Sequence, residues 1–276
     1  MYSKEGIIMA LFGFIGAGNM GYPLLKAAIK TFGNEEVVYT DASAERNRFV
    51  MEETKVVFAE DNIAVVKHCK FLVMAVKPQY FPEVMNQINN IITKDQVVIS
   101  IAAGITIDTL KNGLGNTVRI VRAMPNTPAQ VFQGMSGICY SKDTFSQEEK
   151  NTVEHFFSSF GKFEVFEENL MNAVTCANGS SPAYVYMFIE ALADSVVSYG
   201  IPRDKAYILA AQTVLGAATM VLETKEHPGK LKDNVCSPGG TTIAAVKALE
   251  EYGFRNSIMK ATDACYDKAV SMGSKK

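Results

Sequence analysis

Apolar and polar positions follow two different patterns along this chain. In the first part, short β-branched apolar runs alternate with stretches whose apolar residues recur every three or four positions, which predicts strands alternating with helices. The expected strands are Ala10–Ile15, 37–39, 71–75, 97–101, 118–121, 136–140 and 163–166. Strands and helices of this length in alternation predict an α/β fold: a Rossmann-type, doubly wound, mostly parallel sheet.

Strand signals stop after residue 168, and only helical stretches follow. Pro182 and Pro202 are typical of first helical turns, and Gly200 is typical of a helix end. We therefore expect a Rossmann domain over 1–168 and an all-α domain over 169–276. Ala, Met, Val and Ile occupy more than one face of these helices, so the second domain is expected to dimerise. Residues 1–8 do not fit the first β-unit, and we interpret them as a non-functional extension before Met9.

The first strand runs directly into Gly16-x-Gly18-x-x-Gly21, a pattern that suits a dinucleotide pyrophosphate. Gly16 permits a tight turn, Gly18 lets the backbone approach phosphates, and Gly21 lets the helix pack on the strand. The free N–H groups of the helix start face the anion. Asp41 follows about 20 residues after Gly21, where a ribose-binding acid is expected. The predicted contacts are Gly16, Ala17, Gly18, Asn19, Met20, Gly21 and Asp41.

Three further loops directly follow predicted strands: 76–78, 102–104 and 124–128. Ligands of open α/β sheets bind outside the carboxyl ends of the strands, so these loops and the glycine loop together describe a dinucleotide cleft. In the helical part, Ser237-Pro238-Gly239-Gly240-Thr241-Thr242 opens a helix. Its free N–H groups and two hydroxyls suit a small carboxylate, whereas a plain helix cap is the alternative interpretation.

Composition argues against several classes of protein: nucleic-acid-binding, disulfide-stabilised, metal-binding and membrane-spanning. The net charge of −2 gives no support for nucleic-acid binding, and 48% hydrophobic residues allow a sizeable core. Five separated cysteines without a CxxC pattern indicate reduced thiols, hence a cytoplasmic protein without a disulfide framework. The isolated histidines argue against a metal centre. No apolar run reaches the ~18 residues of a membrane span, so no membrane partner is expected.

Seven motifs, in order and over nearly the whole chain, resemble those of the pyrroline-5-carboxylate reductases. They are GFIGAGNMG (13–21), AVKPQ (75–79), SIAAGIT (100–106), RAMPNTP (122–128), SPAY (181–184), HPGKLKDNVCSPGGTTI (227–243) and LEEYGFR (249–255). The resemblance implies hydride transfer from NAD(P)H to the C=N carbon of 1-pyrroline-5-carboxylate, which gives L-proline in the last step of proline biosynthesis. It also implies a homodimer with interleaved helical domains, often assembled into a decamer.

The resemblance also assigns roles to matching positions. The cofactor is expected on the glycine loop and on Asn62, Ala75, Val76, Lys77, Pro78, Asn126 and Pro128. The substrate carboxylate is expected on Ser237, Gly239, Gly240 and Thr241. Thr242 would hydrogen-bond the ring nitrogen, and it is the candidate catalytic residue. For the cofactor, Asp41 slightly favours NADH because a carboxylate repels a 2′-phosphate, whereas Ser43, Arg46 and Arg48 suit NADPH.

Two departures from the family pattern matter. The family usually reads SGSGPAY where this chain has Asn178-Gly179-Ser180-Ser181-Pro182-Ala183-Tyr184, so Ser181 replaces a glycine and could crowd the cleft. Lys225 stands where some members carry a glutamate. Two other functions remain open: a dinucleotide-binding regulator that has lost catalysis, and a β-hydroxyacid-type dehydrogenase. The SPGGTT loop argues against the dehydrogenase, since that class relies on a lysine in its helical domain.

Overall fold

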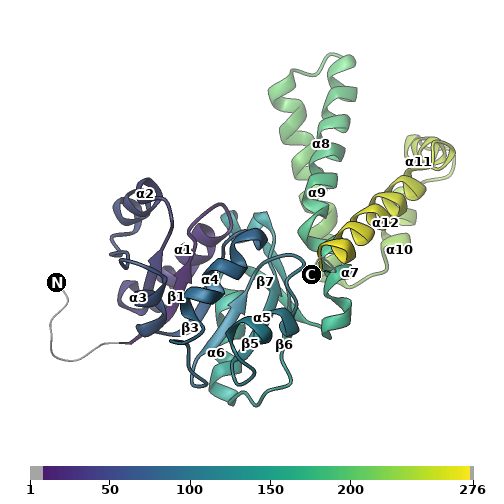
Figure 1. Ribbon diagram of the computed structural model, residues 1–276. Coiled ribbons are helices and arrows are strands. Elements are labelled where there is room, and N and C mark those ends of the chain that lie inside the picture. Colours follow the sequence, from purple (N-terminus) through teal and green to yellow (C-terminus); the bar gives the residue numbers. More distant parts are fainter. Residues whose placement is uncertain (1–8, 274–276) are drawn as a thin grey trace. The chain divides into compact units, whose positions relative to one another are not determined.

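The computed structural model describes residues 9–273 (Figure 1) and divides into two compact units. The first unit extends to Ser180 and includes the chain from Cys265 onward, and the second is Ser181–Ala264. This division reflects internal contacts, and the domain boundary at 168 stays a prediction. The extension proposed for residues 1–8 lies outside the described residues.

A seven-stranded sheet forms the centre of the first unit, in the order β2-β1-β3-β4-β5-β6-β7. The strands are β1 (Ala10–Ile15), β2 (Val37–Thr40), β3 (Cys69–Met74), β4 (Val97–Ser100), β5 (Arg119–Met124), β6 (Gly134–Tyr140) and β7 (Gly161–Val165). All neighbours are parallel except β5 and β6. The chain reverses its direction of travel across the sheet between β1 and β3, which is where α/β sheets bind ligands.

Helices cover both faces of this sheet (Figure 1). They are α1 (Gly21–Phe32), α2 (Ala44–Thr54), α3 (Asn62–Lys67), α4 (Phe81–Ile88), α5 (Ile107–Leu114) and α6 (Gln147–Ser158). Because side chains alternate along a strand, each face has its own core. Phe12, Phe14 and Phe156 belong to one core, and Leu72 and Phe81 belong to the other. The predicted doubly wound sheet is confirmed.

Local signals set several of these helix ends. Gly33 ends α1 with a φ of 105°, which glycine adopts without strain. Asp61 caps the start of α3, where its carboxylate accepts a hydrogen bond from the backbone N–H of Ala64 at 2.7 Å. Beyond β7, α7 (Met171–Val174) continues into one π-helical turn, Thr175–Gly179.

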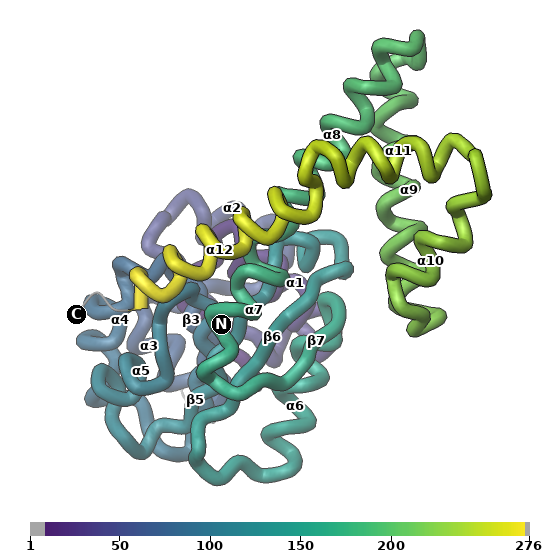
Figure 2. Tube along the Cα trace, turned by 90° about the vertical axis from the view of Figure 1, so that its right-hand side faces the viewer, coloured from purple at the N-terminus to yellow at the C-terminus, as the bar shows by residue number. Residues whose placement is uncertain are grey.

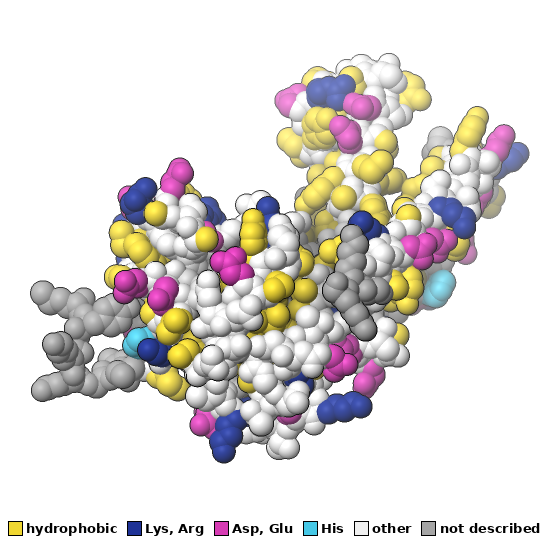
Figure 3. All heavy atoms as spheres, in the orientation of Figure 1, with side chains coloured by type: hydrophobic (Ala, Val, Ile, Leu, Met, Phe, Trp, Pro, Cys, Tyr) yellow, Lys and Arg dark blue, Asp and Glu magenta, His cyan; other side chains and the backbone are white. Residues whose placement is uncertain are grey.

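The second unit is helical: α8 (Ser181–Ser198), α9 (Arg203–Thr224), α10 (Pro228–Val235), α11 (Thr241–Glu251) and the first half of α12 (Phe254–Gly273). Helices α8 and α9 lie side by side (Figures 1 and 2), and their closest contacts bury only Ala193, Ala206 and Ala210. Large apolar side chains such as Met187 and Ile208 are more than 60% exposed. Figure 3 shows apolar side chains gathered along this helix pair.

Within residues 9–273, α9 is the helix long and apolar enough to cross a bilayer by length and composition. Core helices of soluble proteins meet the same criterion, so this is weak evidence for a membrane span. Polar residues such as Gln212 and Thr213 interrupt its apolar positions. The exposed faces of α8 and α9 are therefore better explained by a protein partner than by lipid.

Candidate functional site

The glycine loop joins β1 to α1 in a tight turn that depends on two of its glycines. Gly16 has a φ of 96°, and a Cβ there would lie 2.8 Å from the carbonyl oxygen of Ala75. A Cβ on Gly21 would lie 2.2 Å from the carbonyl oxygen of Gly16. Gly18 is exposed, with no described atom within 4 Å of an added Cβ. The loop is thus packed at Gly16 and Gly21 and open at Gly18, where a phosphate would approach.

Asp41 lies against this loop. Its Oδ2 accepts a hydrogen bond from the N–H of Ala17 at 2.8 Å, and its Oδ1 accepts one from Ser43 at 2.9 Å. The side chain of Asn47 holds the Asp41 backbone with two hydrogen bonds of 2.8 Å. The carboxylate is therefore oriented before any ligand binds, and it retains lone pairs for ribose hydroxyls.

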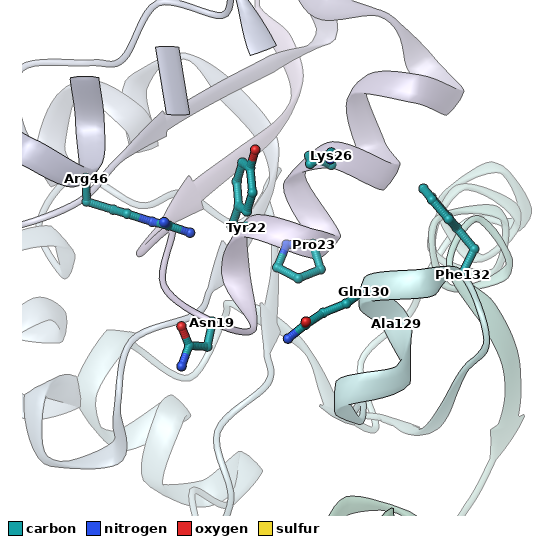
Figure 4. Close-up of a pocket in the computed structure, with 8 residues that line it drawn as sticks. All are labelled: Asn19, Tyr22, Pro23, Lys26, Arg46, Ala129, Gln130 and Phe132. Carbon is teal, nitrogen blue, oxygen red and sulfur yellow. The ribbon is translucent and has the colours of Figure 1, made fainter. Parts of the chain in front are cut away.

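A pocket of about 260 Å³ opens beside the glycine loop (Figure 4). Its lining residues are Asn19, Tyr22, Pro23, Lys26, Arg46, Ala129, Gln130 and Phe132. Two cations and no carboxylate line it, so an anionic group is favoured there. Sequence reasoning missed Tyr22 and Lys26. Their spacing of four residues on one helix was the available signal.

Aromatic rings hold Arg46 in this pocket. The guanidinium carbon lies 4.7 Å from the centre of the Tyr22 ring and 4.9 Å from that of Phe49. The Nε group donates to the carbonyl oxygen of Ala17 at 2.5 Å. Since Nε is used in this way, the two terminal nitrogens remain to meet an anion. Burial, followed by the charge of Glu53, raises the pKa of Tyr22, so its hydroxyl stays protonated.

The loops after β1, β3 and β4 come together as predicted. Ala75 donates from its backbone N–H to Ile15 at 2.8 Å, and Ile101 donates to Met74 at 3.3 Å. Lys77 is exposed. The side chain of Asn62 donates to Oε1 of Gln87 at 2.6 Å. Contacts from Asn62, Val76, Lys77 and Pro78 to a cofactor stay predictions.

Asn126 and Pro128 begin the loop after β5, where η3 (Thr127–Val131) follows. The side chain of Asn126 is only 9% exposed, and its Oδ1 accepts from the N–H of Met135 at 2.8 Å. Its Nδ2 donates to the carbonyl oxygen of Asn178 at 3.2 Å. Sequence reasoning gave Asn178 no role, because a π-helical turn has no simple sequence signature.

The SPGGTT loop belongs to the second unit and joins α10 to α11. Gly239 has a φ of 70°, and Gly240 donates from its backbone to Ser237 at 3.0 Å. A Cβ on Gly240 would lie 2.4 Å from the Ser237 hydroxyl oxygen. In the described part of the chain, no side chain caps the start of α11. Gly240 is therefore the N-cap residue of α11, and both the anion site and the plain helix cap stay predictions for this turn.

His227 caps the preceding helix α10. Its Nδ1 accepts a hydrogen bond from the backbone N–H of Gly229 at 3.0 Å, so this histidine is a structural cap. All five cysteines are free. Among residues 9–273, no group of three His, Cys, Asp or Glu side chains is placed to hold a metal ion.

Two family profiles match the chain. Residues 168–272 match the family model described as "Pyrroline-5-carboxylate reductase dimerisation". Residues 11–104 match the one described as "NADP oxidoreductase coenzyme F420-dependent". The pyrroline-5-carboxylate reductase of Escherichia coli is 44% identical over 94% of this chain and 97% of its own. The pyrroline-5-carboxylate reductase of Methanosarcina acetivorans is 40% identical over 95% of this chain and 98% of its own.

Solved structures of the same name share the fold. The enzyme from Coxiella burnetii has a TM-score of 0.89 at 33% identity, covering 97% of this chain and 100% of that one. The Plasmodium falciparum enzyme, solved with NADP bound, has a TM-score of 0.87 at 32% identity, covering 98% and 100%.

Proposed function

The chain belongs to the pyrroline-5-carboxylate reductase family, and we propose that its two units divide the work of that reaction. The protein is an NAD(P)H-dependent oxidoreductase of proline biosynthesis. A hydride passes from the cofactor to the C=N carbon of 1-pyrroline-5-carboxylate, and L-proline results. The Rossmann unit supplies the dinucleotide site, and the SPGGTT loop supplies the carboxylate site.

The observation that carries the dinucleotide site is the glycine loop with Asp41 oriented against it. The open face of Gly18 and the uncapped start of α1 provide N–H groups for the pyrophosphate. When bound, the cofactor supplies the reactive hydride. The contribution of this chain is to place the hydride-donating carbon of the cofactor against the C=N carbon of the substrate. Asn126 and Pro128 are proposed to lie at the nicotinamide.

The carboxylate of the substrate is proposed to rest on the first turn of α11 and on Ser237. Gly239 and Gly240 let the backbone fold close to the anion, and Thr241 adds a hydroxyl donor. Thr242 orients the ring nitrogen and aids its protonation, since a protonated imine is the better hydride acceptor. A threonine hydroxyl is too weak an acid to protonate the nitrogen alone near neutral pH, so water would complete the transfer.

Replacing Thr242 by alanine is expected to lower kcat/KM for pyrroline-5-carboxylate by at least tenfold, about 1.4 kcal/mol. Thr242→Ser keeps the hydroxyl and should retain activity within threefold. Thr152→Ala, in α6 of the other unit, is the matched control. Steady-state kinetics on the three variants make the comparison, and unchanged kcat/KM in Thr242→Ala would remove this residue from the mechanism.

Cofactor choice is proposed to depend on opposing contributions from Asp41 and Arg46, with both cofactors used and NADH slightly favoured. The Asp41 carboxylate suits ribose hydroxyls and repels a 2′-phosphate. The terminal nitrogens of Arg46 suit that phosphate, and a charge-assisted hydrogen bond is worth roughly 1.5–3 kcal/mol.

Arg46→Met is therefore expected to raise KM for NADPH at least tenfold while KM for NADH changes less than threefold. Arg48→Met tests the second arginine that the sequence suggested for the phosphate. Arg48 is exposed on the same helix and does not line the pocket, so its loss should change neither KM by more than threefold. Asp41→Ser should shift the preference toward NADPH. An unchanged NADH/NADPH ratio in Asp41→Ser would refute the assignment of Asp41.

The first test of the function is cofactor oxidation at 340 nm with and without pyrroline-5-carboxylate. Substrate-dependent oxidation of NADH or NADPH that yields proline establishes the reductase. A protein that binds the dinucleotide and does not turn over would favour the regulator, with Ser181 crowding the site. Ser181 is the first residue of α8.

Self-association follows from the family, and we propose that a second copy covers the exposed faces of α8 and α9. Dimers are proposed to assemble further into a decamer. Sedimentation without detergent would give a multiple of the 30.1 kDa chain, and a monomer there would contradict this assembly.

Free cysteines support a cytoplasmic location, which cell fractionation tests.

A further inference from the structure

The π-helical turn Thr175–Gly179 brings Asn178 to the ends of β5 and β6, within the first unit. Figure 2 shows α7, which leads into this turn, beside β6. Asn178 Nδ2 donates to the carbonyl oxygen of Met124 at 2.8 Å and to that of Met135 at 2.9 Å. The residue is 8% exposed. One side chain therefore joins the last residue of β5 to the beginning of β6.

Asn126, in the loop after β5, adds two hydrogen bonds to those of Asn178. Asn126 Nδ2 donates to the backbone oxygen of Asn178, and Asn126 Oδ1 accepts from the N–H of Met135. Two carboxamides thus form four hydrogen bonds that connect the π-helical turn, the end of β5, the loop after it and β6. Buried polar networks of this kind hold one arrangement when their donors are satisfied, because a lost partner leaves a buried group unpaired.

We propose that Asn178 is a positioning residue that holds the loop after β5 in place for hydride transfer. This inference rests on the proposed function, in which Asn126 and Pro128 of that loop lie at the nicotinamide. Hydride transfer is sensitive to the placement of the reacting atoms, so a loosened loop would slow the chemical step more than it would weaken binding.

The contacts around Asn178 in this chain suit an amide nitrogen. Both groups that face Nδ2 are carbonyl oxygens, which can only accept, so the nitrogen and not the oxygen must face them. Among the described residues, Oδ1 of Asn178 has no hydrogen-bond partner. The orientation of the side chain therefore satisfies both N–H donors of Nδ2, while the buried acceptor Oδ1 is left without a partner.

The neighbouring Gly179 lies close to the same strand end. A Cβ there would lie 2.4 Å from the terminal methyl of Met124, which is the end of a flexible side chain and can move aside. The hydrogen bonds of Asn178, and not this contact, therefore hold the turn against the end of β5.

The test compares Asn178→Asp and Asn178→Ala with Asn172→Asp, a matched change in the half-buried Asn172 of α7. Aspartate has the shape of asparagine but presents oxygen to two carbonyl oxygens. Alanine removes both donors, so the carbonyl oxygens of Met124 and Met135 lose their shared partner. For each protein we would measure amide hydrogen exchange over residues 124–135, kcat and KM with pyrroline-5-carboxylate, and the isotope effect with NADH deuterated at C4.

Both Asn178 variants are expected to exchange amides of 124–135 at least tenfold faster and to lose at least tenfold in kcat. KM for the dinucleotide should stay within threefold, and the isotope effect on kcat should increase because hydride transfer becomes slower. A purely structural role would lower the amount of folded enzyme without changing the isotope effect. Asn172→Asp should match the wild type in every measurement.

Unchanged exchange over 124–135 in a folded Asn178 variant would overturn the inference, as would an unchanged kcat and isotope effect. If Asn178→Asp does not fold, Asn178→Ala decides by the same readouts. A wild-type protein that does not reduce pyrroline-5-carboxylate would refute the proposed function instead, and the exchange measurement would still decide whether Asn178 holds the loop.

Discussion

Gly21→Ala is expected to raise the Kd for NADH and NADPH at least 100-fold, about 2.8 kcal/mol. A methyl group at this position would lie 2.2 Å from the carbonyl oxygen of Gly16 and 3.0 Å from the Cβ of Ala75. Backbone atoms cannot yield as the end of a flexible side chain does, so the turn itself must move. That movement separates the start of α1 from β1 and misplaces the N–H groups proposed for the pyrophosphate. Fluorescence titration with each cofactor measures the loss.

Gly18→Ala separates two causes of weaker cofactor binding: movement of the turn itself, and direct obstruction of the pyrophosphate by an added methyl group. An added Cβ at Gly18 meets no described atom within 4 Å, so this variant should keep the wild-type Tm. Its methyl group would occupy the face where the pyrophosphate is proposed to approach, and Kd should rise at least tenfold. Wild-type affinity in Gly18→Ala would contradict the proposed placement of the cofactor, whereas wild-type affinity in Gly21→Ala would contradict the packing argument.

Glu149→Gln is expected to lower the free energy of unfolding by about 3 kcal/mol, the usual cost of breaking a buried ion pair. The Glu149 carboxylate is paired with Lys70 at 2.9 Å and with Arg119, and its Oε2 accepts from the N–H of Ser146 at 2.9 Å. The residue is 7% exposed. It therefore links the start of α6 to β3 and β5, and the amide would leave two cations without a counter-charge. Thermal unfolding should show a Tm lower by roughly 6–12 °C.

The control is Glu148→Gln, an exposed neighbour in the same first helical turn, which should change stability by less than about 0.5 kcal/mol. The difference between wild type and Glu149→Gln should also depend on pH. Burial by itself would raise the pKa of Glu149, but hydrogen bonds from Lys70, Ser146 and Arg119 outweigh it and lower the pKa to about 2.

Because the folded pKa lies below the ordinary value of 4.5, the stabilisation by Glu149 is fully present above pH 4.5 and is lost as the pH falls toward 2. Urea unfolding of both proteins between pH 7 and pH 3 measures this. An equally large difference in stability at both ends of that range would contradict the ion-pair assignment.

The sequence alone was sufficient for the order of the seven strands and for the change to a purely helical second part. Strand β1 was predicted with its observed bounds, because an apolar run ending in glycine is a local signal. The stop at Gly33 and the caps at Asp61 and His227 are also local, since each depends on residues within one helical turn. The glycine loop and Asp41 were found for the same reason: their spacing follows from one β-α-β unit.

Other features depended on residues far apart in the chain. The helix α5 was not predicted, and neither was the π-helical turn that carries Asn178. The pocket of Tyr22, Lys26 and Arg46 joins α1 to the helix after β2 and to η3. Periodicity gives the face of a helix, but it does not say which distant element that face meets.

The sequence by itself determined a Rossmann unit followed by a helical unit, and it predicted a dinucleotide loop and an anion-binding turn, because each is encoded by neighbouring residues. Only the tertiary structure decided that Asn178 holds Met124 and Met135, and that Arg46 is held between aromatic rings beside the glycine loop. Met124 and Asn178 are 54 residues apart, and their hydrogen bond exists because the sheet brings β5 to the π-helical turn. Such contacts depend on topology, and no local pattern of residues specifies them.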